Sequence, residues 1–202
     1  MSQELVLPKL LSIAAAQAGA SATKATRADD IEDVRACQRG DREAFDRLAE
    51  RYQRAVYRLC YRYVNRHEDA SDLTQETLLK AYRAIDRFRG DASFSTWIYR
   101  IAVNSCLNFR SARRPEPRAL SESLTDASPG ADANIEREDE ASRVRAAVAR
   151  LPERQRATLI LKVYQELTHE EVAGILGTSV GTVKANLFHA LRNLRKLLER
   201  EP

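Results

Sequence analysis

The sequence has few of the residues that interrupt helices. Its 202 residues include only seven glycines and six prolines. Alanine, leucine, arginine and glutamate, which favour helix, are plentiful, so the composition predicts an all-α fold. A chain of this length forms one domain or two small ones, each large enough for a modest core.

Cysteine and long apolar runs are also scarce. The three cysteines are odd in number and share no short spacing, which is typical of a reduced, cytoplasmic protein. Near the N-terminus, Glu4 precedes any basic residue, and Pro8 and Lys9 interrupt an apolar run far shorter than a membrane span. We therefore expect no membrane insertion, and we interpret residues 1–28 as a disordered extension.

Motifs of catalytic and metal sites are missing as well. No phosphate-binding GxxxxGK[ST] sequence occurs, no nucleophile has an evident base beside it, and the three histidines lack metal-ligand spacing. The sequence therefore predicts a protein that is not an enzyme and needs no cofactor or metal. The net charge of +4 is only mildly basic, so a polyanionic partner has to be inferred from where the charge lies.

What the sequence does contain is a series of amphipathic helices. Asp41 is placed to cap the first long one, Gly90 to end the second, and Ser93 or Ser95 to begin the third. With a short helix near "DDIEDVRACQ", they predict a bundle over residues 29–113. The expected buried stripes are Phe45, Leu48, Tyr52, Val56, Leu59 and Tyr63, then Ala70, Leu73, Thr77, Ala81, Ile85 and Phe88, then Trp97, Ile101, Cys106 and Phe109.

Residues 114–140 are interpreted as an acidic linker. Proline, serine, glycine and aspartate replace the apolar stripe there, and acidic residues outnumber basic ones. If residues 113–134 are the flexible part, they reach roughly 70 Å when extended at ~3.3 Å per residue. We therefore expect two helical domains, the bundle and residues 141–202, joined by a flexible tether.

The second domain contains the pattern of a helix-turn-helix. Thr168 and Glu171 have capping-box spacing, and Gly177 ends the first helix. An ordinary helical hairpin with solvated charges is the alternative. Because acidic residues stay on the first helix and basic ones gather on the second, the pattern favours binding of duplex DNA. The outward side of the second helix carries Lys184, Asn186, His189, Arg192 and Lys196.

The second helix of the first bundle has an acidic outer face. Asp72, Gln75, Glu76 and Leu79 lie opposite its core stripe, and such a face repels DNA. One interpretation is an ordinary solvated surface. The other is a docking surface for a basic groove on a protein partner. The residues alone leave both open.

The third helix and the turn before it have a different character. We expect Tyr99, Arg100, Val103, Asn104 and Asn108 on the outward side, where arginine and asparagine can hydrogen-bond base edges. In the turn, Phe88, Phe94 and Trp97 flank Ser93, Ser95 and Thr96. We expect Phe88 and Trp97 in the core, which leaves Phe94 as the spare aromatic beside the small hydroxyls. Such a turn would suit an unpaired base, and a plain structural turn is the alternative.

The sequence resembles regions two and four of a bacterial extracytoplasmic-function sigma factor of the sigma-E type. The resemblance rests on "DREAFDRLAERYQRAVYRLCYRYV", "EDASDLTQETLLKAYRAIDRFRGDASFSTWIYRIAVN" and "LPERQRATLILKVYQELTHEEVAGILGTSVGTVKANLFHALRNLRK". It covers roughly residues 29–198, apart from the linker. It implies a cytoplasmic transcription initiation factor that binds core RNA polymerase, reads the minus-ten and minus-thirty-five promoter elements and helps to open the DNA.

The resemblance also implies roles for individual residues. Docking on the clamp of the largest polymerase subunit falls to Asp72, Gln75, Glu76 and Leu79. Minus-ten DNA is assigned to Arg89, Asp91, Ser93, Phe94, Tyr99, Arg100 and Asn104. Minus-thirty-five DNA is assigned to Thr182, Lys184, Ala185, Asn186, Phe188, His189 and Arg192. The second domain would rest on the flap of the second-largest subunit, and an anti-sigma protein is a further implied partner.

Two other classes of protein would also fit the helix-turn-helix and the acidic face. A stand-alone helix-turn-helix regulator would bind a palindromic operator without polymerase, and a pure adaptor would bind polymerase without reading DNA. Family members often carry arginine where this chain has Asn186 and His189, with Lys184 nearby. Because these residues make fewer bidentate guanine contacts than arginine, the promoter sequence cannot be carried over.

Overall fold

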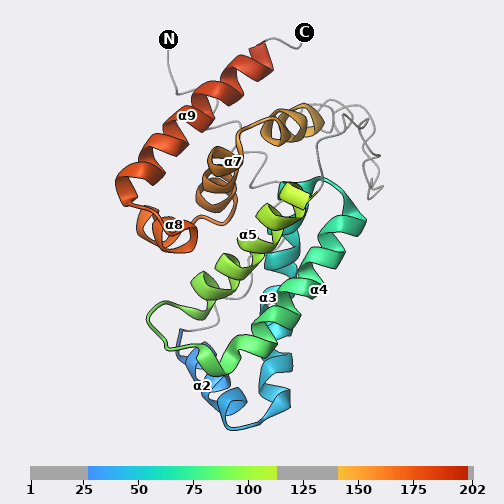
Figure 1. Cartoon of the computed structure of the whole chain (residues 1–202), viewed down its shortest axis with the longest axis vertical. Coiled ribbons are helices and arrows are strands. Elements are labelled where there is room, and N and C mark those ends of the chain that lie inside the picture. Colours follow the sequence, from blue (N-terminus) through green and yellow to red (C-terminus); the bar gives the residue numbers. More distant parts are fainter. Residues whose placement is uncertain (1–26, 113–140, 200–202) are drawn as a thin grey trace, which may run out of the picture.

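The computed structural model describes residues 27–112 and 141–199, and all regular structure within these ranges is helical (Figure 1). The all-α prediction is therefore confirmed. Residues 1–26 of the expected extension and the expected acidic linker lie outside the described residues. Within the described part, no helix is both long enough and apolar enough to span a membrane.

The first module, as we call residues 27–112, contains four helices and a short 3-10 turn. They are α2 (Arg27–Gln38), α3 (Arg42–Val64), α4 (His67–Ala84), the turn Ile85–Arg87, and α5 (Phe94–Ala112). The Asp41 side chain accepts hydrogen bonds from the backbone N–H groups of Glu43 and Ala44, at 3.0 and 3.3 Å, so it caps α3 as expected. The predicted stripe of α3 is buried along its whole length.

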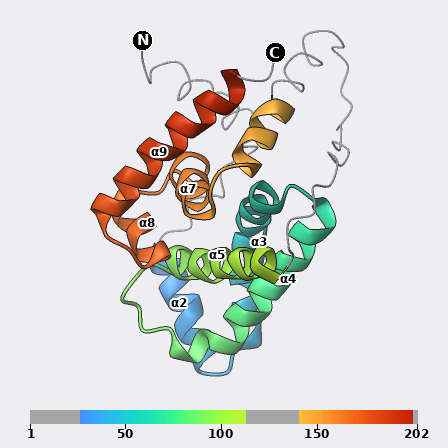
Figure 2. The same ribbon diagram turned by 45° about the horizontal axis from the view of Figure 1, so that its top comes forward.

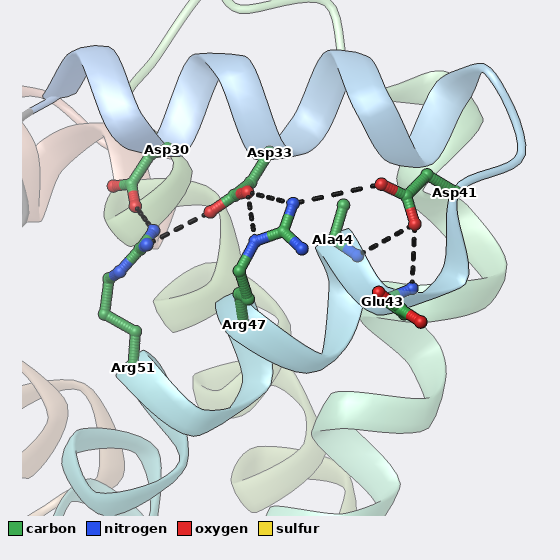
Figure 3. A network of polar contacts seen from close by, with 7 residues as sticks. All are labelled: Asp30, Asp33, Asp41, Glu43, Ala44, Arg47 and Arg51. Atoms are coloured by element: carbon green, nitrogen blue, oxygen red, sulfur yellow. Dashed lines mark hydrogen bonds and ion pairs between the residues drawn. The ribbon is translucent and has the colours of Figure 1, made fainter.

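Paired charges fix α2 on α3 (Figure 3). Arg51 contacts Asp30 at 2.6 Å and Asp33 at 3.0 Å, and the Arg47 Nε donates to Asp33 at 2.8 Å. The Tyr52 hydroxyl donates to Asp30, and burial together with this bond raises the pKa of Tyr52. Because both aspartates are buried, removing one partner would leave an uncompensated charge. The sequence predicted the short helix but not this network.

The second module, residues 141–199, holds the expected helix-turn-helix. Residues 141–149 are helical, and α7 (Glu153–Leu159) continues into the π-helical turn Ile160–Tyr164. The helix-turn-helix itself is α8 (His169–Leu176) and α9 (Val180–Glu199). Thr168 and Glu171 form the predicted capping box, and Gly177 adopts the left-handed conformation (φ 60°) that ends α8.

The core face of α5 differs from the prediction. Tyr99 and Val103, expected outward, are only 8% and 2% exposed, whereas Ile101 and Phe109 of the expected stripe are half-buried. The reason is that α5 packs against α3 and α4 on one side and against α8 on another (Figures 1 and 2). A helix covered on two sides buries more of its circumference than a single stripe. Burial also raises the pKa of the Tyr99 hydroxyl to about 12.

Candidate nucleic-acid interface

The outer face of α4 is open to solvent. Asp72, Gln75, Glu76 and Leu79 are all exposed, as the sequence predicted, and Leu79 is 54% exposed. Glu76 pairs with Lys80 one turn later, at 2.5 Å. The face therefore combines carboxylates with one exposed apolar side chain.

Tyr82 enlarges this face, and sequence reasoning missed it. The side chain is exposed, and its ring packs edge-on against Phe45 with ring centroids 5.0 Å apart. Its position three residues after Leu79, on the same side of the helix, was the available signal. Beside the face lies a cavity of about 450 Å³ between α3 and α4. It is lined by Gln53, Arg54, Tyr57, Arg58, Ser71, Thr74, Gln75 and Leu78.

The turn before α5 is built around a serine cap. The Ser93 hydroxyl accepts a hydrogen bond from the Thr96 backbone N–H at 3.1 Å, so Ser93 rather than Ser95 caps the helix. Its oxygen also lies 2.9 Å from the Ser95 hydroxyl and 2.8 Å from the Thr96 hydroxyl. These three hydroxyls therefore hold the turn together. Ser93 and Ser95 are partly exposed, whereas Thr96 is buried.

The aromatic residues of the turn are arranged the opposite way to the prediction. Phe94, expected to be the spare aromatic, is only 3% exposed and packs against Tyr52, Phe88 and Trp97, with ring centroids 5.2, 6.0 and 5.6 Å apart. Because it lies one turn before the buried Ile98, it falls on the core face of α5. Phe88 and Trp97 are half-buried instead, so they supply the accessible aromatic surface.

Polar groups surround this aromatic surface. Arg89 and Asp91 are exposed on either side of Gly90, whose left-handed φ of 78° favours glycine. On α5, Arg100 and Asn104 are exposed one turn apart, as predicted. The turn and the polar side of α5 therefore combine ring faces with groups that donate and accept hydrogen bonds.

The outer side of α9 is basic and accessible. Of the residues assigned to minus-thirty-five DNA, Asn186 is half-buried and the others are exposed, with Phe188 47% exposed beside His189. The Ser179 hydroxyl accepts from the Thr182 backbone N–H at 3.1 Å and fixes the start of the helix. No carboxylate occurs in α9 before Glu199. The inner side is seated by Val183, Ala190 and Leu194.

The two candidate DNA-binding faces meet in this structure. The Arg100 guanidinium donates to the backbone carbonyl of Gly174 in α8 at 2.5 Å. Asn104 and Asn186 line the same cavity, of about 340 Å³, between the modules. The α4 residues do not take part in this contact. The predicted minus-ten and minus-thirty-five residues are thus partly brought together, whereas the docking residues stay apart.

Comparisons with known proteins agree with this anatomy. Residues 48–116 match the family model for sigma-70 region 2, and residues 141–194 match that for sigma-70 region 4. The RNA polymerase sigma-H factor of Pseudomonas aeruginosa is 36% identical over 186 residues, which cover 86% of this chain and 96% of the relative. The ECF RNA polymerase sigma-E factor of Escherichia coli K12 is 39% identical over 168 residues, covering 78% and 87%.

Solved structures share the fold. CnrH, in complex with the cytosolic domain of CnrY, aligns with a TM-score of 0.67 and 23% identity over 86% of this chain and 99% of that one. The sigma factor RpoE of Bartonella quintana, in complex with the anti-sigma factor NepR, aligns with a TM-score of 0.59 and 21% identity over 78% and 98%. At these identities the likeness shows the fold alone.

A helical region 2 followed by a helix-turn-helix region 4 defines a sigma-70-type initiation factor. Within that class, the identity and coverage of the relatives show that the chain belongs to the extracytoplasmic-function sigma factors of RNA polymerase. It therefore binds core RNA polymerase and promoter DNA and directs promoter-specific transcription initiation.

Proposed function

We propose that three separate surfaces divide the work of initiation in this chain. The α4 face docks on polymerase, the turn and polar side of α5 capture unpaired minus-ten DNA, and α9 reads minus-thirty-five duplex. The observation that carries the proposal is the segregation of charge. Asp72 and Glu76 stand on the exposed α4 face, whereas α9 has a basic outer side without a carboxylate before its last residue.

The α4 face suits a basic protein groove better than DNA. Its carboxylates repel phosphate, and its exposed Leu79 and Tyr82 offer apolar surface that a protein partner can cover, with Tyr82 of the type that is enriched among interface anchors. The clamp of the largest polymerase subunit is the partner that we assign to it. The cavity between α3 and α4 would receive a side chain of that partner next to Gln75.

The start of α5 suits an unpaired base. Phe88 and Trp97 supply partly exposed rings on which a base can stack, and Arg100 and Asn104 supply groups that hydrogen-bond base edges. Phe94 then supports this surface from the core. Ser93 and Tyr99 also act by holding the helix in place, because one is its cap and the other is buried.

The energy of strand opening comes from binding. DNA stacking is worth about 1.4 kcal/mol per step, and each captured base returns ~1 to 3 kcal/mol. One or two captured bases therefore nucleate melting over a few base pairs only, and polymerase supplies the rest. The chain itself is proposed to catalyse no reaction, and polymerase as its partner places it in the cytoplasm.

Region 4 is a weak reader by itself. Lys184, Asn186 and His189 offer two or three base contacts of ~1 to 3 kcal/mol each. Promoter specificity therefore arises when both modules act on one polymerase, which raises their effective concentration. The flap of the second-largest subunit is the proposed seat of this module, with residues 114–140 as the tether from the first module.

An anti-sigma protein is a further proposed partner. Both solved relatives described above were determined in complex with another protein, CnrY for CnrH and NepR for RpoE, and NepR is an anti-sigma factor. Because these relatives share the fold with this chain, the same kind of partner is proposed here. Co-purification from cells identifies it.

Runoff transcription with purified core polymerase tests the proposed function. We expect the full chain to direct initiation at discrete genomic sites, and the double variant Gln75→Ala and Glu76→Ala to lose that activity at limiting polymerase. Binding to a palindromic duplex without polymerase would favour a stand-alone regulator. Polymerase binding without any initiation would favour an adaptor and overturn the proposal.

A further inference from the structure

Residues 85–93, which we call the α4–α5 connection, are held at both ends. The Ser93 cap described above fixes the end that enters α5. The other end is held by Gln38, the last residue of α2. The Gln38 side-chain Nε2 donates to the backbone carbonyl of Ile85 at 3.1 Å and to that of Phe88 at 3.0 Å. A side chain 47 and 50 positions away in the sequence therefore reaches into the connection.

Both N–H groups of one amide are used in this contact. A carbonyl oxygen only accepts hydrogen bonds, so it is the –NH₂ end of the Gln38 side chain that faces the connection. The Ile85 carbonyl also accepts from the Phe88 backbone N–H at 3.0 Å, which closes the 3-10 turn. Because Gln38 bonds the first carbonyl of this turn and the carbonyl that follows it, it fixes the direction in which the chain leaves the turn.

Gln38 projects from a well-defined corner of the fold. The left-handed Gly40 (φ 96°) ends α2, and its backbone N–H bonds to the Cys37 carbonyl at 2.8 Å. The next N–H, of Asp41, bonds to the Ala36 carbonyl at 3.1 Å, which completes a Schellman motif. Asp41 then caps α3, and the ion pairs in Figure 3 hold α2 on α3. The Gln38 amide is thus presented from an anchored helix end.

The second carbonyl that Gln38 holds belongs to an aromatic residue of the proposed base-binding surface. The Phe88 ring packs against Trp97 with ring centroids 5.3 Å apart, and against Phe94 at 6.0 Å. Phe88 and Trp97 are both half-buried. Because the Phe88 backbone carries the ring, a shift of this backbone would move the ring and uncover Trp97.

We propose that Gln38 is a positioning residue for the capture of an unpaired base. It holds the Phe88 backbone so that the Phe88 and Trp97 rings form one stacking surface, and it does not itself contact DNA. The inference rests on the proposed function, because the assignment of this surface to minus-ten DNA gives the rings a base to bind. The hold of Gln38 on the connection can be measured without DNA.

Gln38→Met is the main test variant, because methionine has nearly the length of glutamine but carries neither a charge nor a donor. Gln38→Lys is the rescue variant, since its side chain also reaches the connection and has N–H donors. Gln38 is exposed, so neither substitution disturbs the core, and circular dichroism should show both variants folded. Arg39→Met changes the next residue, which is also exposed, and serves as the control.

The single tryptophan of the chain reports on the connection directly. Trp97 lies against the Phe88 ring, so its fluorescence senses a displacement of that ring. In Gln38→Met we expect a red shift of the Trp97 emission and stronger quenching by acrylamide. Gln38→Lys and Arg39→Met should match wild type. If Gln38→Met has the emission and quenching of wild type, Gln38 does not order the rings and the proposal is overturned.

Promoter opening by the holoenzyme is the second readout. We expect Gln38→Met to reduce opening ~3- to 10-fold, which corresponds to the net worth of one hydrogen bond. Its affinity for core polymerase should equal that of wild type, and Gln38→Lys should recover most of the opening. Wild-type opening in a Gln38→Met variant whose Trp97 fluorescence has changed would overturn the positioning role.

An abasic scan shows whether the effect passes through the captured base. Single abasic sites are placed along the minus-ten non-template strand, and the site at which wild type loses most opening marks that base. If Gln38 acts through the base, the losses caused by Gln38→Met and by this abasic site should not add, because both remove the same contact. Fully additive losses would mean that Gln38 acts elsewhere, and the proposal would fail.

These outcomes separate the inference from the proposed function. If the wild-type chain directs initiation but Gln38→Met changes neither the Trp97 fluorescence nor the opening, the inference fails while the proposed function stands. If the wild-type chain never directs initiation with polymerase, the proposed function fails. A changed Trp97 fluorescence would then show only that Gln38 orders the rings, and the role in base capture would be lost.

Discussion

Helices α4 and α5 are neighbours in the first module, yet their outer faces are in opposite states. The α4 face is acidic and carries the exposed Leu79 and Tyr82. The contacts described above include none between this face and the second module. The polar side of α5 instead faces α8, with Arg100 bonded to the Gly174 carbonyl. On the surface that we propose for a protein partner no side chain contacts the second module in these contacts, whereas on the surface that we propose for DNA the exposed Arg100 bonds to α8.

The difference affects how readily each surface would bind nucleic acid non-specifically. A free basic and aromatic surface would bind any nucleic acid through phosphate contacts that carry no sequence information. An acidic face with a few apolar anchors is protected from that hazard by its own charge.

The largest effect is expected at Phe94. Phe94→Ala removes a buried ring at the start of α5, so the free energy of unfolding should fall by about 3–5 kcal/mol. Urea denaturation measures it, and Trp97→Ala, at a half-buried ring, should cost less. If Phe94→Ala leaves stability unchanged but abolishes promoter opening, Phe94 is the stacking aromatic that the sequence indicated, and α5 begins with an open face.

The next largest effect concerns the α4 face. Gln75→Ala with Glu76→Ala should weaken binding to core polymerase by about 2–3 kcal/mol, a loss of ~30- to 150-fold, because central polar anchors of an interface are removed. Glu68→Ala, also an exposed carboxylate of α4, is the matched control. Affinity is measured by titrating labelled chain with core enzyme. Unaltered affinity for the double variant would remove the docking assignment.

On α5, the expected effect is smaller and falls on a different step. Asn104→Ala should weaken promoter opening by about 1–2 kcal/mol, or ~5- to 30-fold. Permanganate footprinting of unpaired thymines measures the extent of opening. Binding to core polymerase should not change. The control is Asn108→Ala, an exposed asparagine one turn further along. Equal losses of opening and of polymerase binding would mean that Asn104 has a structural role only.

The sequence predicted α4 well because that helix has one buried side. Its core residues Ala70, Leu73, Thr77 and Ala81 repeat at steps of three and four, so the residues left over define the exposed face. The capping box of α8 was equally readable, since both partners lie within one turn of the chain. Local patterns therefore yielded the helices, the N-terminal caps of α3 and α8 and the helix-turn-helix. The end of α4 was predicted wrongly at Gly90, because the chain leaves the helix at Ala84 and continues as the 3-10 turn Ile85–Arg87.

The sequence did not predict α5 correctly because its second covering surface comes from the other module. The contact between Arg100 and Gly174 joins residues 74 positions apart, and no local period reports such a pairing. Arg156 shows the same limit, because nothing in the local sequence distinguishes it from the nearby Arg154 and predicts that it will be buried against the end of α3. Contacts between modules are decided by tertiary packing, which a helical pattern does not encode.

The smallest effect is expected at Lys184 on α9. Because Lys184 is one exposed cation among several, Lys184→Ala should cost about 1 kcal/mol, or ~5-fold, at the upstream element. A base contact would make that loss specific to one position of the element, whereas a phosphate contact would weaken all sequences alike and reduce the salt slope by about one. Lys196→Ala, in the last turn of the helix, is the control.

Holoenzyme binding to a set of single-base promoter variants at two salt concentrations separates these outcomes. A uniform loss would reassign Lys184 to the phosphate backbone and leave Asn186 and His189 as the reading residues of α9.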